Sequence, residues 1–441
     1  MLDVTITPHR EFLTADRAEQ TLFVMLKLRP TREVSASRPP ITFIPIVDTS
    51  GSMYEETSCG KTKLNIVIES LEQLVKTQQT DPRDRIAIIQ FDDTASVLLP
   101  PTSTHDTQAI QQAIKRLRDS SGGTHLAKGM RKALELLENC ELSSRRILIF
   151  TDGETFDEID CRELSIKFAK AGIPITALGV GDYNEDLLIQ LSDRTGGQVL
   201  NIVETTQSNG TGDVPITELP TVIFQQIQQS QAEVINNLKL SLQTVKGVTL
   251  RRLCRVYPDR VDFPLDTTPY PIGSALAHDD TVFILEFNVD SRAGSRVRIA
   301  QLGLTYDTPG QQRRGELPPQ NLIVQFVAGQ DSVAQTNPEV MGYVQQCNIT
   351  NLIDRAADIA EQDPDRAQQL LETAKRITEK IGNDSILQAL NQTISEVRHT
   401  RKISPGARKT IKMSAKGKTV KMSGSPDDQL FEGNIRDLTG A

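Results

Sequence analysis

The stretch ITFIPIVDTSGS, residues 41–52, joins a nearly continuous apolar run to a polar turn. An apolar run of this kind, without alternation, is typical of a strand buried on both faces of a parallel sheet. Two further runs have the same character, RIAIIQF at 85–91 and RRILIFT at 145–151. We therefore expect these segments to be buried strands of one sheet.

Apolar residues at helical spacing lie between these runs, for example Leu64, Val67, Ile68 and Leu71. Strands alternate with helices from residue 41 to about residue 205. This order predicts an α/β domain with a doubly wound, mostly parallel sheet, which we assign to residues 39–232. Sheets of this type bind ligands at the carboxyl ends of their strands.

The segments on both sides of this domain alternate at period two, as strands do. Residues 1–38 and 233–332 show this pattern, with Val4 and Ile6 in the first segment. Because an isolated hairpin is only marginally stable, the N-terminal strands need partners. We expect the two segments to form one antiparallel β-sandwich into which the α/β domain is inserted.

Residues 338–400 have helical periodicity and are interrupted at Asp363–Pro364 and Gly382–Asn383, which predicts a small bundle of about three helices. The remaining segment, 401–441, is a basic tail that contains the repeat KTIKMS and KTVKMS. Thr and Lys alternate there with Ile, Val and Met, and like charges repel one another. We expect a tail that is flexible in the isolated protein. It is either a solvated extension or a peptide that an acidic partner surface orders, with Thr410 and Thr419 as phosphorylation candidates.

Hydroxyl and carboxyl side chains follow the predicted strands. Asp48, Ser50 and Ser52 come at the end of the first buried run. Thr124, in GGTHL, and Asp152, in TDGE, lie in loops that the sheet topology brings to the same edge. Five oxygen ligands without His or Cys select a hard cation such as Mg²⁺.

The motifs DTSGS, GGTHL and FTDGE, in this order, closely resemble the metal-ion-dependent adhesion site of von Willebrand factor A (VWA) domains. The resemblance covers residues 41 to about 205 and fills all five family positions. It implies a cation, Mg²⁺ with Ca²⁺ or Mn²⁺ as alternatives, whose last coordination position is left to a carboxylate of a partner. The wider layout resembles a bacterial, intracellular group in which this domain is inserted in a β-sandwich and followed by helices.

Other readings of these motifs stay open. DTSGS also suits a turn that caps the following helix without binding metal. Asp92–Asp93 is either a carboxylate pair or, as we favour, a hairpin turn. His125 is expected to be a hydrogen-bonding residue at the rim of the site rather than a catalytic base, because no nucleophile motif accompanies it. Neither GxGxxG nor the GxxxxGK[ST] phosphate loop is present.

Composition limits the function further. The net charge of −8 and pI of about 5.4 argue against general nucleic-acid binding. The five cysteines are scattered, which favours free thiols. The first residues lack the apolar core of a signal peptide, and no run reaches the ~20 apolar residues of a membrane span. We therefore expect a cytoplasmic protein that does not bind membranes.

These observations predict a non-enzymatic, metal-dependent scaffold that grips an Asp or Glu of a partner protein. Two alternatives concern the partner. One is a phosphorylation-coupled adaptor whose tail a phosphothreonine-binding domain reads. The other is an adaptor subunit of an AAA+ ATPase, which intracellular members of the resembled family often serve. The resemblance also extends to some plant ubiquitin ligases, but the Cys/His-rich RING that those enzymes add is lacking here.

Overall fold

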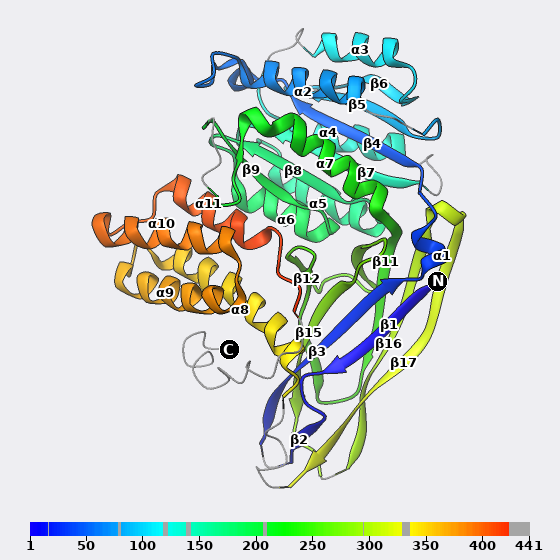
Figure 1. Cartoon of the computed structure of the whole chain (residues 1–441), viewed down its shortest axis with the longest axis vertical. Coiled ribbons are helices and arrows are strands. Elements are labelled where there is room, and N and C mark those ends of the chain that lie inside the picture. Colours follow the sequence, from blue (N-terminus) through cyan, green and yellow to red (C-terminus); the bar gives the residue numbers. More distant parts are fainter. Residues whose placement is uncertain are drawn as a thin grey trace.

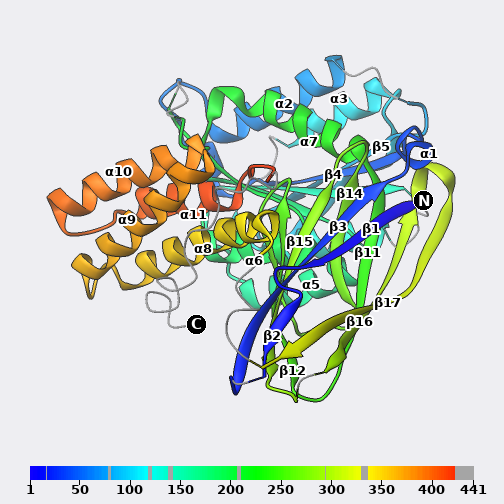
Figure 2. The ribbon, with the colours of Figure 1, turned by 60° about the horizontal axis from the view of Figure 1, so that its bottom comes forward.

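The computed structural model describes residues 1–15, 17–77, 81–117, 122–137, 143–205, 210–293, 295–328 and 336–422. These residues form three parts that lie next to one another, an α/β domain, a β-sandwich and a group of C-terminal helices (Figure 1). The helices lie to one side of the other two parts, which Figure 2 shows from a second direction. The predicted fold class is confirmed.

The α/β domain is built on a seven-stranded sheet with the order β10-β9-β8-β7-β4-β5-β6. All neighbouring strands are parallel except β5 and β6, which form an antiparallel hairpin. Every residue of the central strand β4 is buried, as its apolar sequence predicts. The strands are β4 (Ile41–Asp48), β5 (Arg85–Phe91), β6 (Ala95–Ser103), β7 (Ser144–Thr151), β8 (Ile175–Val180), β9 (Val199–Val203) and β10 (Val214–Pro215).

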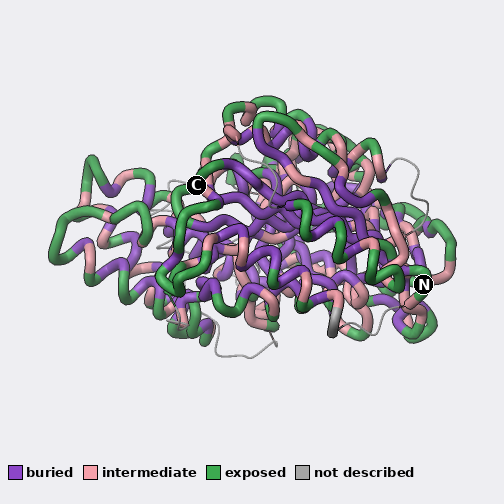
Figure 3. The backbone as a smooth tube through the Cα atoms, turned by 90° about the horizontal axis from the view of Figure 1, so that it is seen from above, coloured by how far each residue is buried: buried purple, intermediate pink, exposed green. Residues whose placement is uncertain are grey.

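Helices cover both faces of this sheet. One apolar core lies between the sheet and α2, α3 and α7, and the other between the sheet and α4, α5 and α6. The helices are α2 (Lys63–Thr77), α3 (Thr107–Arg116), α4 (Leu126–Leu137), α5 (Glu158–Lys170), α6 (Glu185–Thr195) and α7 (Leu219–Ala232). Short 3₁₀ turns are η1 (Gly51–Tyr54) and η2 (Ile216–Glu218). Seen from above in Figure 3, buried residues are concentrated in the middle of the molecule and exposed residues lie mostly at its outside.

The β-sandwich consists of two five-stranded sheets that share one apolar core. The first sheet has the order β1-β3-β15-β12-β13, and the second has the order β14-β11-β16-β17-β2. Strand β3 lies between β1 and β15, so strands from before and after the α/β domain pair directly. A short helix, α1 (Arg32–Ser35), and the turn η3 (Pro309–Gln311) lie at the edges.

The bounds of these strands are β1 (Leu2–Pro8), β2 (Phe12–Thr14), β3 (Glu19–Pro30), β11 (Glu233–Thr244), β12 (Val248–Tyr257), β13 (Val261–Phe263), β14 (Tyr270–Leu276), β15 (Thr281–Asp290), β16 (Arg296–Thr308) and β17 (Arg313–Val327).

The C-terminal part consists of four helices, α8 (Pro338–Ile359), α9 (Pro364–Ile381), α10 (Asp384–Thr400) and α11 (Pro405–Lys416). The predicted breaks are confirmed, because Asp363 and Asn383 cap α9 and α10 and Gly382 ends α9 at a φ of 80°. Helix α8 also packs on the first sheet of the sandwich, where the Sγ atoms of Cys254 and Cys347 are 3.3 Å apart. Both are free thiols, as are Cys59 and Cys161, whereas Cys140 lies outside the described residues.

The expectation of a flexible, extended tail is wrong for its first part. Residues 405–416 form the fourth helix, α11, which contacts the α/β domain, the sandwich and the other helices. Its lysines end on carboxylates of the same chain, so the acidic surface that we expected from a partner is intramolecular. Lys412 donates to Asp186 at 2.8 Å and Lys416 donates to Asp193 at 2.7 Å. The second repeat extends beyond the described residues, which end at 422.

Candidate functional site

The first loop of the candidate site follows β4 directly. Asp48 is fully buried at the end of this strand, and its Oδ1 accepts a hydrogen bond of 2.8 Å from the backbone N–H of Ser50. This bond folds the chain back over the strand end and leads into η1. The hydroxyl oxygens of Ser50 and Ser52 then lie 3.2 Å apart. The spacing of the DTSGS motif thus gathers three oxygen-bearing side chains on one turn.

Two further loops meet the first one. Thr151 Oγ1 donates to Asp48 Oδ2 at 2.7 Å, and Ser52 Oγ donates to Asp152 Oδ1 at 2.7 Å. A Cβ added at Gly153 would lie 3.8 Å from Thr124 Oγ1 and 3.9 Å from Ser52 Oγ. The Thr124 hydroxyl therefore faces the same small space. The structure brings together all five side chains that the sequence singled out.

The electrostatics of this cluster suit a bound cation. Burial raises the pKa of Asp48 to about 6, although hydrogen bonds from Ser50 and Thr151 act to lower it, and the neighbouring Asp152 carboxylate raises it further. A divalent cation between the two carboxylates would offset the free-energy cost of keeping Asp48 charged in its buried position. Two carboxylates and three hydroxyls are also the donors that a hard ion prefers, so these residues fit Mg²⁺.

Sequence reasoning missed one charged residue of the site. Lys63, at the start of α2, donates to Asp152 Oδ2 at 2.8 Å and to Glu55 Oε2 at 2.9 Å, and its side chain is 8% exposed. A lysine at the start of an amphipathic helix is ordinary, so the sequence held no signal for this contact. The ammonium holds one oxygen of Asp152 and leaves the other facing Ser52.

His125 lies beside Asp93 and Phe156. Its Nδ1 is 3.8 Å from Asp93 Oδ1 and has no hydrogen-bond partner among the residues that the structure describes, and its ring lies 5.5 Å from the ring of Phe156. The neighbouring Asp92–Asp93 pair is a hairpin turn, as we favoured, since Asp92 Oδ1 accepts from the N–H of Thr94 at 2.7 Å. Asp93 Oδ1 accepts from the N–H of Gly123 at 3.0 Å, which supports the loop that carries Thr124.

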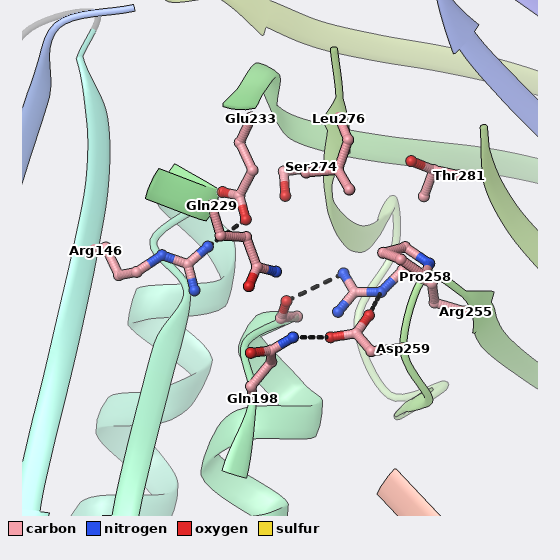
Figure 4. Close-up of a pocket in the computed structure, with 11 residues that line it drawn as sticks. Arg146, Gln198, Gln229, Glu233, Arg255, Pro258, Asp259, Ser274, Leu276 and Thr281 are labelled. Carbon is pink, nitrogen blue, oxygen red and sulfur yellow. Dashed lines mark hydrogen bonds and ion pairs between the residues drawn. The ribbon is translucent and has the colours of Figure 1, made fainter. Parts of the chain in front are cut away.

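A polar hollow between the α/β domain and the sandwich is a second candidate (Figure 4). Two cations and two carboxylates line it in pairs: Arg146 with Glu233, and Arg255 with Asp259 at 2.7 Å. Gln198 also donates to Asp259 at 2.6 Å. The Arg146–Glu233 pair joins the two domains, the Arg255–Asp259 pair lies within the sandwich, and Gln198 links that pair to the α/β domain. With both pairs neutralised, this hollow is an internal junction of the two domains rather than a ligand site.

Among the residues that the structure describes, no three His, Cys, Asp or Glu side chains form a metal-binding group. The hydroxyl-rich cluster around Asp48 is therefore the best candidate for a functional site. Within the same residues, none of the helices is long and apolar enough to cross a membrane.

Comparison with known proteins identifies two parts of this architecture, the α/β domain and the C-terminal helices. Residues 43–154 match the family model of the von Willebrand factor type A domain. Residues 338–421 match the Sll0103-like, C-terminal α-helical domain. The chain therefore carries a VWA domain, which indicates a protein-interaction module, and it combines this domain with the C-terminal helices of the second family.

Relatives share the full layout. The chain is 23% identical to the protein sll0103 of Synechocystis, over 86% of this chain and 88% of that one. A von Willebrand factor type A structure from Catenulispora acidiphila is similar at a TM-score of 0.76 and 19% identity, over 95% of this chain and 97% of that one. The ArnB paralog VWA2 from Sulfolobus acidocaldarius is similar at a TM-score of 0.62 and 17% identity, over 94% and 97% of the two chains. At these identities the structures establish the fold.

Proposed function

We propose that this protein is a non-enzymatic binding module that grips a carboxylate of a partner protein through a divalent cation, Mg²⁺ in the first place. The observation that carries the proposal is the meeting of three loops, which gathers two buried carboxylates and three hydroxyls at the carboxyl edge of the sheet. The residues that would hold the ion are Asp48, Ser50, Ser52, Thr124 and Asp152.

The bound ion would supply a positive centre with a coordination position for a carboxylate oxygen of the partner. The protein residues supply the rest. Asp48 is oriented from both sides, by the Ser50 N–H and by the Thr151 hydroxyl. Lys63 fixes Asp152 and adds a positive charge beside the site. An arrangement held in place before the partner arrives loses little freedom on binding.

The two alternative functions, a phosphorylation-coupled adaptor and an adaptor of an AAA+ ATPase, involve different partners. Thr410 donates to Asp213 Oδ2 at 2.8 Å inside the docked helix α11, so a phosphate there would meet a carboxylate. This contact does not favour Thr410 as the residue that a phosphothreonine-binding domain would read, and Thr419 stays the candidate for such an adaptor. An AAA+ ATPase remains a partner class that the experiment below can recover, and the cytoplasm remains the compartment that we expect.

The test is a pull-down from native lysate with the full-length chain as bait, in Mg²⁺ and in EDTA, with Asp48→Ala bait as the matched control. Mass spectrometry should identify partners that bind wild-type bait in Mg²⁺ and are lost both in EDTA and with the variant. A set of partners that is the same under all three conditions would refute metal-dependent capture.

A further inference from the structure

Exposed apolar side chains gather beside the candidate metal site. In the described part of the chain, six large hydrophobic residues are exposed, and the two most exposed are Phe156 at 79% and Ile159 at 74%. Both belong to the segment that follows Asp152. Tyr54, the last residue of η1, is 36% exposed. Large exposed apolar groups that cluster in this way mark interaction surfaces.

Contacts place Phe156 directly against the loop that carries Thr124. Its backbone N–H donates to Thr124 O at 3.0 Å, and its Cε2 lies 3.3 Å from the position of a Cβ added at Gly123. Its ring also lies beside that of His125. The Phe156 side chain therefore forms part of the rim around the cluster of oxygen ligands, and Ile159 lies in the first turn of the helix that follows.

Hydrogen bonds fix this rim in place. Thr155 Oγ1 lies 2.6 Å from Asp157 Oδ1 and 3.1 Å from Thr124 O, which share its one hydroxyl proton, and it accepts from the N–H of Leu126 at 3.0 Å. The segment that exposes Phe156 is thus tied to the segment that supplies a metal ligand. Rigid aromatic groups presented in this way are typical anchors of protein interfaces.

Exposed carboxylates lie on the segments of this rim: Glu56 follows η1, Glu154 precedes Phe156, and Asp93 supports the Thr124 loop. The basic side chains on these segments already have acceptors, because Lys128 donates to Asp93 O and Arg131 lies 3.5 Å from Asp160. Carboxylates around an apolar patch repel an anionic lipid surface and attract basic side chains. The charge pattern therefore favours a protein segment with basic residues as the occupant.

We propose that Phe156 and Ile159 form an apolar docking surface for a partner segment in which the metal-binding Asp or Glu is neighboured by a large apolar residue and by Lys or Arg. This inference rests on the proposed function and specifies the partner of the same site. The metal selects the carboxylate, the apolar surface selects its neighbour, and the acidic rim selects the flanking charge. We name this surface, Phe156 with Ile159, the apolar rim.

The experiment is a selection of random 12-residue peptides on phage against the full-length protein in Mg²⁺, with elution by EDTA. The same selection is run against Asp48→Ala, against the double variant Phe156→Ser and Ile159→Ser, and against Ile323→Ser. Ile323 is a matched control because it is 41% exposed on strand β17 of the sandwich. A Mg²⁺ titration of each protein reports separately on the metal site.

Wild-type protein and Ile323→Ser should both enrich acidic residues next to large apolar residues, with Lys or Arg nearby. The double variant should still enrich acidic residues but lose the apolar preference. A peptide from the wild-type selection should bind the double variant about tenfold more weakly or worse, as expected for the loss of an aromatic anchor.

Three kinds of outcome would overturn the inference, and they can be distinguished from one another. Enrichment of acidic residues without apolar neighbours, or equal enrichment by the double variant, would leave carboxylate capture standing and refute the apolar rim. No EDTA-eluted enrichment from wild-type protein would refute the proposed function as well. Sedimentation that shows Mg²⁺-dependent dimers sensitive to Phe156→Ser would assign the surface to a second copy of this chain and would also refute the proposal.

Discussion

Replacing Lys416 with methionine should loosen helix α11 from the body of the protein. The ammonium donates to Asp193 Oδ2 on α6 at 2.7 Å and to Asp262 Oδ2 on β13 at 3.0 Å, and the side chain is 8% exposed. Burial acts to lower the pKa of Lys416, but the two carboxylates hold it above its ordinary value. The lysine is therefore charged and joins the α/β domain to the sandwich.

The expected loss of stability depends on the interactions that Lys416→Met removes. Methionine keeps the aliphatic length but removes the cation that the two carboxylates share. Asp193 loses its ion pair, whereas Asp262 keeps Arg252 at 3.0 Å and Arg260 at 2.8 Å, which limits the cost. Breaking a buried ion pair costs roughly 3–5 kcal/mol. The carboxylates of Asp193 and Asp262 are 15% and 29% exposed, so water reduces this cost. We expect a loss of about 2–3 kcal/mol, which corresponds to an increase of roughly 30- to 150-fold in local opening.

The loss should depend on pH in a defined direction. Burial raises the pKa of Asp193 to about 6 even with Lys416 beside it. Without the lysine this pKa rises further. A carboxyl whose folded pKa is raised destabilises the fold above that pKa, and the penalty disappears as the pH falls through it. The difference between variant and wild type should be largest above neutral pH and should shrink toward pH 5.

Hydrogen–deuterium exchange of peptides from residues 405–416, corrected for intrinsic rates at each pH, measures this opening. Lys402→Met is the matched control, because Lys402 is exposed in the turn before α11. Lys402→Met should leave the protection of α11 unchanged from wild type. If Lys416→Met also changes this protection by less than about threefold at pH 7.5, the ion pairs do not hold the helix and the reasoning is wrong.

Three further outcomes are expected. Burial, with a contribution from the neighbouring Arg10 charge, lowers the pKa of His9 from 6.5 to about 4, so the free energy of unfolding by urea should fall by about 2 kcal/mol between pH 7 and pH 5. His9→Asn should remove most of that slope. In a Cys140→Ala background, a thiol reagent should modify Cys59 rapidly, and the buried cysteines should react only after unfolding. Gly129→Val should lower stability by roughly 1–3 kcal/mol in thermal unfolding, because its Cβ would lie 2.8 Å from Ile46 Cγ2.

The sequence pattern was sufficient to predict those elements whose structure depends mainly on neighbouring residues. The uninterrupted apolar run at 41–48 predicts a strand covered on both faces, and every residue of β4 is buried. Gly196 after a periodic segment predicts a helix end, and it adopts a left-handed φ of 74° there. The five oxygen-bearing residues could be chosen in advance because parallel strands bring their carboxyl ends to one edge.

The basic tail shows where local pattern fails. Its like charges favour an extended, solvated segment only if no counter-charges are nearby. Asp186 and Asp193 supply those counter-charges from more than 200 residues earlier in the chain. Contacts between residues so far apart in the sequence cannot be predicted from the spacing or periodicity of residues within one segment. With the charges neutralised, the spacing of Ile411 and Ala415 suits one face of a helix, and both are buried.

The apolar rim and Lys63 escaped prediction for a related reason. Phe156 stands among acidic residues in a loop, where a single aromatic gives no periodic signal. Only the fold reveals that it faces the site and stays exposed. Lys63 likewise acquires a role only because η1 and the end of β7 bring Glu55 and Asp152 to it.

The most direct test of the central claim is a Mg²⁺ titration by calorimetry of the chelator-treated, full-length protein. Wild-type protein and the control Asp160→Ala, which removes an exposed carboxylate of α5, should each bind one Mg²⁺ per chain. Asp48→Ala should bind none at that site and should remain folded, because the variant removes a buried carboxylate whose charge is costly without a cation. Equal Mg²⁺ affinity in Asp48→Ala and wild type would contradict the account.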